Sequence, residues 1–168
     1  MQEFLQKLVK EAGLLAKEFY KEGIVFETKV NESDLVTKGD QEVSNFVINK
    51  IREEYPEHGI ISEEEKDPIN PDAEYVWVID PIDGTRNFAN HIGVWCSMIG
   101  ITKNGEPHIG AIYDPNNDEL FFAEAGKGSF MNGERIRVRD YDNLEHCYLV
   151  FSNGMRDYCG AKNYERYF

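Results

Sequence analysis

Apolar residues recur at helical spacing near the start of the chain, with lysine and glutamate between them. The apolar positions of this stretch are Phe4, Leu8, Ala12, Leu15 and Phe19. Their spacing predicts an amphipathic helix that ends near Gly23. The polar side of this helix carries both signs of charge, which favours packing on a protein core over binding to a membrane surface.

A second helix is predicted after a short extended segment at residues 24–30. Thr37 and Asp40 mark its start, because their spacing resembles a capping box, and Pro56 lies beyond its end. The buried side of this helix would carry the apolar residues Val43, Phe46, Val47 and Ile51.

Strand patterns fill most of the chain after residue 59. They cover residues 60–61, 76–79, 96–102, 109–113, 119–124, 136–138 and 149–151. From residue 96 on, turn signals separate the strands, among them Asn104-Gly105 and Asn132-Gly133. We therefore expect an α+β fold, in which two long helices pack on one face of an antiparallel sheet of about six strands.

Two carboxylates stand at the end of the strand pattern at 76–79. This strand runs into a polar corner formed by Asp80, Pro81, Asp83, Gly84 and Thr85. Pro81 disfavours the helical region for Asp80 and keeps it extended at the strand tip. Gly84 permits a turn, after which Thr85 can cap a helix. Carboxylates suit Mg²⁺ and free N–H groups suit phosphate, so the corner could hold both, unless it merely marks a turn after a core strand.

Three motifs that contain acidic residues follow one another along the chain. They are DLVTKGD at 34–40, ISEE at 61–64 and WVIDPIDGTRNF at 77–88. In this order and spacing they resemble the motifs of the inositol monophosphatase family of Mg²⁺-dependent, lithium-sensitive phosphatases. The resemblance runs from about residue 29 to about residue 139. It implies the N-terminal portion of that family's layered α/β sandwich.

The resemblance also implies a set of metal ligands. Glu63, Asp80 and the Ile82 carbonyl would bind one Mg²⁺, while Asp80 and Asp83 would reach a second. Glu64 would support these ligands from behind or bind a weaker third ion.

Catalytic and substrate-binding roles follow from the same resemblance. Asp40 and Thr85 would orient and activate the attacking water. The residues that would contact the substrate are Ile82, Asp83, Gly84 and Thr85. The implied reaction is hydrolysis of a small sugar or polyol phosphate, with inositol monophosphate as the first expectation.

The substrate remains open among relatives that share the corner. Fructose 1,6-bisphosphate, histidinol phosphate and 3′-phosphoadenosine 5′-phosphate are the alternatives. Arg86 stands where threonine is common in inositol phosphatases, and in this respect it resembles the histidinol-phosphate branch.

The charge and cysteine content narrow the choice of partner and compartment. With 18 basic and 31 acidic residues the formal net charge is −13, which argues against non-specific binding to nucleic acid or anionic membranes. Bound cations would reverse the local sign for a phosphate substrate. Three cysteines without CxxC spacing and the lack of a long apolar run indicate a reducing cytoplasm. The resemblance also implies a homodimer.

The length of 168 residues sets a limit on the function. The chain is too short for the family's whole fold, whose second half contributes a further metal-binding aspartate and holds the alcohol part of the substrate. Residues 1–168 are therefore expected to form an N-terminal metal- and phosphate-binding domain, with the C-terminal half absent. The alternative to an enzyme is a catalytically incomplete metal-binding fragment.

Overall fold

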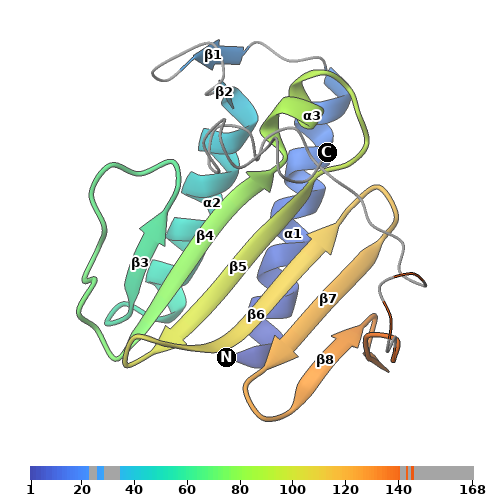
Figure 1. Ribbon diagram of the computed structural model, residues 1–168. Coiled ribbons are helices and arrows are strands. Elements are labelled where there is room, and N and C mark those ends of the chain that lie inside the picture. Colours follow the sequence, from blue (N-terminus) through green and yellow to red (C-terminus); the bar gives the residue numbers. More distant parts are fainter. Residues whose placement is uncertain (23–25, 29–34, 141–142, 144, 146–168) are drawn as a thin grey trace, which may run out of the picture. The chain divides into compact units, whose positions relative to one another are not determined.

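The computed structural model describes residues 1–22, 26–28, 35–140, 143 and 145 (Figure 1). Contacts divide the chain into two units, Met1–Arg137 and Val138–Phe168. The first unit contains every helix and strand described below. The strand predicted at 149–151 lies outside the described residues, and the single domain over residues 1–168 stays a prediction.

Helix α1 confirms the first predicted helix. It spans Gln2–Glu22 and ends just before Gly23. Its buried residues are Leu5, Leu8, Val9, Ala12, Gly13 and Ala16. The predicted apolar residues Phe4, Leu15 and Phe19 are partly buried at the edges of this stripe, where they pack against the core.

Helix α2 confirms the second predicted helix and lies beside α1 on the same face of the main sheet (Figure 1). It spans Lys38–Glu54 and buries Val43, Val47 and Ile51, while Phe46 is partly buried. The side chain of Thr37, which was predicted to cap this helix, lies outside what the structure describes.

The main sheet has seven strands in the order β3-β4-β5-β6-β7-β8-β9. They are β3 (Gly59–Ser62), β4 (Tyr75–Asp83), β5 (Cys96–Lys103), β6 (Glu106–Asp114), β7 (Glu119–Glu124), β8 (Gly128–Met131) and β9 (Glu134–Ile136). From β4 to β9 each strand pairs antiparallel with the next, as predicted. The turns at Asn104-Gly105 and Asn132-Gly133 have positive φ at both residues, which the asparagine-glycine pairs allow.

Strand β3 departs from the antiparallel arrangement, because it runs parallel to β4. Parallel neighbours need a long connection, and residues 63–74 provide it. Both strands therefore end at the same edge of the sheet. Glu63 comes directly after β3, and its N–H donates to the Ile79 carbonyl at 3.1 Å. The mixed sheet thus brings two acidic motifs that lie apart in the sequence to one edge.

Three smaller elements complete the described part of the unit. Strands β1 (Phe26–Thr28) and β2 (Leu35–Thr37) form a separate antiparallel pair. Helix α3 (Thr85–Ala89) is a short helix that follows β4.

The hydrophobic core lies between the two long helices and one face of the sheet. The largest fully buried side chains of the sheet are Trp77, Ile79, Ile82, Ile99, Ile101 and Tyr113. Along β5 buried residues alternate with partly buried ones, so that one face of this strand packs against the helices. The α+β class predicted from the sequence is confirmed.

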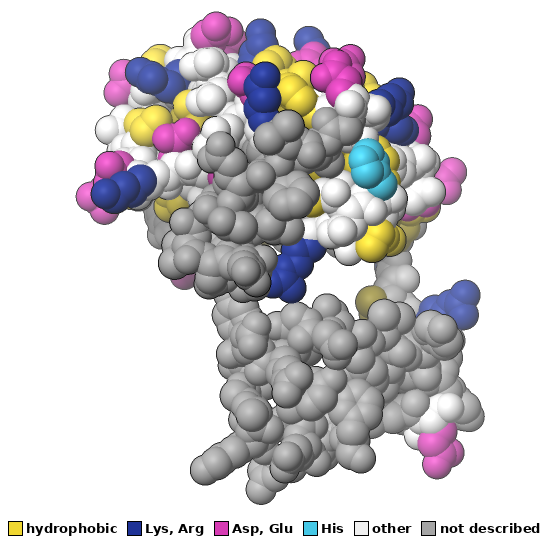
Figure 2. All heavy atoms as spheres, turned by 90° about the horizontal axis from the view of Figure 1, so that it is seen from above, with side chains coloured by type: hydrophobic (Ala, Val, Ile, Leu, Met, Phe, Trp, Pro, Cys, Tyr) yellow, Lys and Arg dark blue, Asp and Glu magenta, His cyan; other side chains and the backbone are white. Residues whose placement is uncertain are grey.

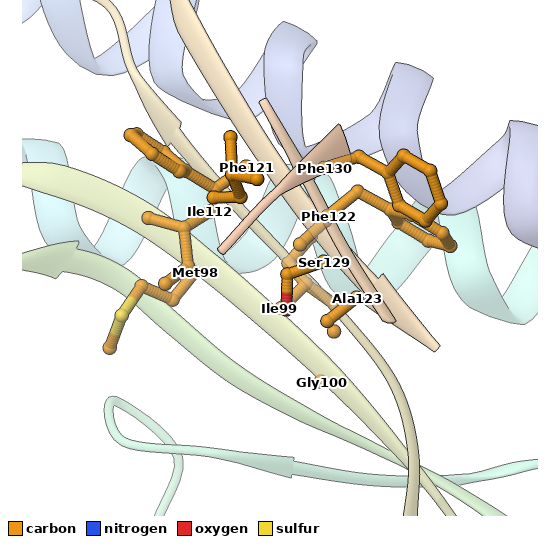
Figure 3. A pocket seen from close by; sticks show the side chains of 12 residues that line it. Met98, Ile99, Gly100, Ile112, Phe121, Phe122, Ala123, Ser129 and Phe130 are labelled. Carbon is orange, nitrogen blue, oxygen red and sulfur yellow. The ribbon is translucent and has the colours of Figure 1, made fainter. Parts of the chain in front are cut away.

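The opposite face of the sheet is apolar, and no helix or strand covers it within the described residues. Ile61, Val78 and Ile112 are 42%, 43% and 38% exposed on it. A hollow of about 450 Å³ lies over β5, β6, β7 and β8, with Met98, Ile112 and Phe121 grouped at one end (Figure 3). Exposed apolar side chains grouped on one face of a sheet are typical of an interface or an aggregation liability.

Gly13 marks a close approach between α1 and the sheet, which gives a first prediction. A Cβ at this position would lie 2.6 Å from Cδ1 of Tyr113, a ring that is buried and whose hydroxyl donates to Asp118 at 2.8 Å. Gly13→Ala gains up to about 1 kcal/mol of helix propensity but incurs about 1–3 kcal/mol of overpacking. We expect a net loss in the free energy of unfolding, measured by urea titration. Gly110→Ala, where a Cβ meets nothing within 4 Å, is the control. A Gly13→Ala protein as stable as its parent would contradict this packing.

An aromatic cluster packs where β4 begins. Phe4 of α1 contacts the rings of Tyr55, which follows α2, and Trp77 of β4. The imidazole of His58 stacks on the rings of Tyr55 and Tyr75, at 4.8 and 5.1 Å between centroids. The buried Trp77 donates its indole N–H to Nδ1 of His58 at 3.0 Å. Burial lowers the pKa of His58, and the Glu74 carboxylate partly opposes this shift. Because Nδ1 accepts the indole hydrogen bond, the contact with Trp77 requires a neutral imidazole.

This cluster predicts a pH-dependent contribution to stability. The unfolded chain, with a histidine pKa of about 6.5, binds the proton more readily than the folded chain. The free energy of unfolding should therefore rise with pH from the lowered pKa of folded His58 up to about 6.5. We expect His58→Gln to flatten this rise, measured by urea unfolding between pH 4.5 and 8. Other groups titrate in both proteins. The quantity compared is therefore the change with pH in the free energy of unfolding of the parent, minus the same change in the variant. Equal slopes in the two proteins would contradict the assignment.

Candidate functional site

A β-bulge shapes the acidic end of β4. Asp80 pairs with Met98 and Asp83 pairs with Cys96, so β4 has one residue more than β5 over this interval. Side chains alternate along a regular strand, and residues three apart would then face opposite ways. Because Met98 and Cys96 share a face of β5, the bulge places Asp80 and Asp83 on one face as well. The two carboxylates of the predicted corner are thereby brought to the same side.

Gly84 turns the chain from β4 into α3. Its φ is 89°, in the left-handed region that favours glycine. A Cβ there would lie 3.0 Å from the carbonyl oxygen of Val94. The following loop is held by Asn87, whose Nδ2 donates to the same Val94 oxygen at 2.7 Å. Thr85 is the first residue of α3, so the N–H groups at this helix start have no partner in a preceding turn.

Asp80 is the electrostatic centre of the corner. Its pKa is raised to about 7, first by burial and then by the carboxylates of Glu63, Asp83 and Asp40, while the Ile82 N–H partly offsets the shift. Its Oδ1 is buried and has no hydrogen-bond partner among the described residues. Among the described residues, the charges that raise this pKa are the carboxylates of Glu63, Asp83 and Asp40. Asp80 is therefore a partly buried carboxyl with other acids around it.

Asp40 and Glu63 reach this corner from two other elements. Asp40 lies in the first turn of α2 and is 1% exposed, whereas Glu63 follows β3 and is exposed. A buried hydrogen bond of 2.7 Å between the hydroxyls of Ser44 and Ser62 ties α2 to the end of β3. This hydrogen bond fixes the segments that carry Asp40 and Glu63 relative to each other. The sequence did not predict it.

Thr85 connects the corner to α2. Its Oγ1 lies 3.0 Å from the Ile82 carbonyl oxygen and 3.4 Å from Oδ1 of Asp40. A hydroxyl has one proton, which goes to one acceptor at a time, and the shorter contact is the one with Ile82. The structure thus brings Asp40 and Thr85 together. It also gives the Ile82 carbonyl a hydrogen-bond donor, although a carbonyl oxygen has a second lone pair.

Two residues of β5 contact the corner without having been predicted to do so. Cys96 donates its thiol to Oδ2 of Asp83 at 3.8 Å, and burial followed by the charges of Asp83 and Asp80 raises the pKa of Cys96 to about 12. The group is therefore a thiol and not a nucleophilic thiolate. Ser97 donates its hydroxyl to the Pro81 carbonyl at 2.7 Å. Their pairing with β4 depends on the bulge, which the sequence does not reveal.

The donor set fits a hard divalent cation. Carboxylates and a carbonyl are the oxygen ligands that Mg²⁺ prefers, and the buried Oδ1 of Asp80 has no hydrogen-bond partner within the part of the chain that the structure describes. Among the described residues, however, no group of three or more His, Cys, Asp or Glu side chains is arranged so that it could hold a metal ion. The other acids thus act on the pKa of Asp80 through their charge, but they do not form a complete set of metal ligands with it. Glu64 is partly buried beside Glu63, in the turn after β3.

Figure 2 shows the end of the unit at which β4 ends. Acidic, basic and apolar side chains are mixed over the described part of this view, so that charge of one sign does not dominate it. None of the described helices combines the length and the apolar character that crossing a bilayer requires.

Known proteins are similar to this chain in both sequence and fold. The model of the inositol monophosphatase family matches residues 1–164. Inositol-1-monophosphatase of Bacillus subtilis is 42% identical over 151 residues, which cover 89% of this chain and 57% of that protein. Fructose-1,6-bisphosphatase/inositol-1-monophosphatase of Thermotoga maritima is 34% identical over 145 residues, with 86% and 56% covered.

A solved structure agrees with these matches. Extragenic suppressor protein suhB from Bartonella henselae superposes with a TM-score of 0.80 at 30% identity, covering 84% of this chain and 55% of that one. The chain spans a little over half the length of these three relatives. The family model extends over nearly all of the sequence, and the chain therefore belongs to the inositol monophosphatase family.

Proposed function

We propose that this chain supplies the metal- and phosphate-binding half of a Mg²⁺-dependent phosphomonoesterase that acts on a small sugar or polyol phosphate. The observation that carries the proposal is the cluster of carboxylates around Asp80, whose pKa of about 7 reflects burial and surrounding negative charge. Such a cluster is costly unless a cation neutralises it. A bound cation in turn attracts a phosphate ester to an otherwise acidic protein.

The proposed ligands are the acids at the shared edge of β3 and β4. Glu63, Asp80 and the Ile82 carbonyl would hold one Mg²⁺, and Asp83 would join Asp80 at a second. When bound, the cations supply Lewis-acid catalysis and neutralise charge on the phosphoryl group. Glu64 would keep Glu63 in place or contribute to a weaker third ion.

Asp40 and Thr85 are the proposed catalytic residues. Thr85 Oγ1 lies 3.4 Å from Asp40 Oδ1, so its hydroxyl could turn from the Ile82 carbonyl to donate to this carboxylate. The Thr85 oxygen would then accept a proton from a water molecule. The lone pair of that water would thereby be directed toward phosphorus. Since Asp40 is buried, its carboxylate is held in one place while it does so.

The phosphate would bind at the turn from β4 into α3. The N–H groups of Gly84 and Thr85 precede the regular hydrogen bonds of α3, so they are oriented to donate to phosphate oxygens. Asp83 at the end of β4 is exposed on the same corner, where it could accept a hydrogen bond from a substrate hydroxyl. This arrangement would favour a phosphate carried on a hydroxyl-rich alcohol.

The remainder of the active site is expected outside this chain. The relatives are nearly twice as long as the matched portion, so the ligands and alcohol-binding residues still needed would come from further sequence. On its own the chain could bind Mg²⁺ without turnover, which is the alternative of an incomplete metal-binding fragment. A cytoplasmic location, lithium sensitivity, a homodimer and the absence of nucleic-acid partners remain predictions.

Mg²⁺ binding should depend on the protonation of Asp80. With a pKa of about 7, this carboxyl is largely protonated below neutrality and must lose its proton to bind a cation. We therefore expect the affinity for Mg²⁺ to rise with pH by up to about tenfold per unit below pH 7, and to level off above it. Calorimetric titration at several pH values, in buffers of different ionisation enthalpy, measures both the affinity and the protons released.

Asp80→Asn is the matched control for this titration. The amide keeps the shape of the side chain but loses its charge, so Mg²⁺ binding should weaken and the proton release should vanish. An Asp80→Asn chain that binds Mg²⁺ as its parent does, with the same release of protons, would remove Asp80 from the ligand set.

The substrate can be determined by assaying four phosphate esters side by side. Inositol 1-phosphate, fructose 1,6-bisphosphate, histidinol phosphate and 3′-phosphoadenosine 5′-phosphate would be tested with Mg²⁺, both on this chain and on any longer protein that contains it. We expect the highest kcat/KM of the longer protein for inositol 1-phosphate. Preference for histidinol phosphate would instead favour the branch suggested by Arg86. Binding of Mg²⁺ without turnover by this chain would support the incomplete fragment.

A further inference from the structure

The bulge that brings the two corner acids together interrupts the hydrogen bonds between β4 and β5. Pro81 and Ile82 lie between the paired residues Asp80 and Asp83, and they face the single residue Ser97 on β5. Pro81 has no N–H to donate, and a bulge leaves one residue of its strand outside the regular ladder. The peptide between the two acids therefore depends on side chains for part of its support.

The hydroxyl of Ser97 provides such support. It donates to the Pro81 carbonyl at 2.7 Å, and Ser97 is 1% exposed, so the hydrogen bond is shielded from water. Ser97 alternates with Cys96 along β5 and therefore points to the helix side of the sheet, away from the acids. Gly13 of α1 lies directly behind it, where a Cβ would be 3.6 Å from the Ser97 oxygen.

The geometry points to Ser97 as a positioning residue for the corner acids, and this inference rests on the function proposed above. Ser97 acts through the Pro81 carbonyl, which fixes the bulge and hence the face that Asp80 and Asp83 share. Without the bulge the two side chains would face opposite ways, because residues three apart alternate on a regular strand. Ser97 touches neither substrate nor cation, so its effect is on how well the two carboxylates bind one set of ions.

A neighbouring residue offers a matched control for a purely structural role. Thr102, also on β5, donates its hydroxyl to the Val76 carbonyl of β4 at 3.5 Å. This cross-strand contact is longer and only partly buried, and it lies at the end of the strand pair farther from the acids. Thr102→Val removes this hydroxyl and preserves the side-chain shape, as Ser97→Ala removes the other with little change in volume.

The test compares parent, Ser97→Ala and Thr102→Val in three measurements. These are the dissociation constant for Mg²⁺ by calorimetry, the melting temperature, and the ¹³C shift of the Pro81 carbonyl, read through the Ile82 amide by NMR. We expect Ser97→Ala to raise the dissociation constant by about tenfold, as loss of a supporting contact behind metal ligands commonly does. The Pro81 carbonyl shift should also move. Thr102→Val should leave the dissociation constant at the parental value.

The outcomes separate this inference from the proposed function. A parental dissociation constant in Ser97→Ala, or an equal rise in both variants, would overturn the positioning role. If the parent itself binds no Mg²⁺, the proposed function fails. The carboxyl ¹³C shifts of Asp80 and Asp83 then decide the inference, because unchanged shifts in Ser97→Ala would overturn it. Should Ser97→Ala not fold, Ser97→Cys keeps a weaker donor of similar size and is judged by the same criteria.

Discussion

The burial of Asp80 among other carboxylates is the constraint that the rest of this structure has to accommodate. Asp80 is partly buried at the end of β4, with the charges of Glu63, Asp83 and Asp40 around it and one oxygen without a partner among the described residues. A fold that needed only stability would replace such a group or pair it with a basic side chain. The fold keeps these acids close in spite of their repulsion, and a cation is the species that would relieve it.

The rest of the unit holds these acids in place. The parallel pairing of β3 with β4 brings Glu63 to the edge where Asp80 lies, and the hydroxyl pair of Ser44 and Ser62 ties α2 to the end of β3. Thr85 links the corner to Asp40. Each acidic segment is thus fastened to a neighbour by a backbone pairing or a short polar contact. The core between helices and sheet gives these contacts a rigid base.

Much of this could be predicted because the signals are local. Periodicity located both long helices, asparagine-glycine pairs located two hairpins, and the sequence DPIDGT at 80–85 located the corner. The parallel direction of β3, the strand β8 and the bulge at Pro81 could not be predicted in the same way. They depend on which strands pair and in which register, and tertiary packing decides this. The support from Ser97 follows from the bulge and was hidden for the same reason.

The chain spans a little over half the length of the relatives that it matches, and the outer face of its sheet is apolar. The acidic corner can be tested by itself on this chain with Mn²⁺, a paramagnetic stand-in for Mg²⁺ that broadens NMR signals near its site. We expect substoichiometric Mn²⁺ to broaden the amide signals of Glu63, Asp80 and Asp83 first, and excess Mg²⁺ to restore them. Broadening spread over the other acidic surfaces, or absent from this corner, would contradict the proposal that these carboxylates converge on a cation.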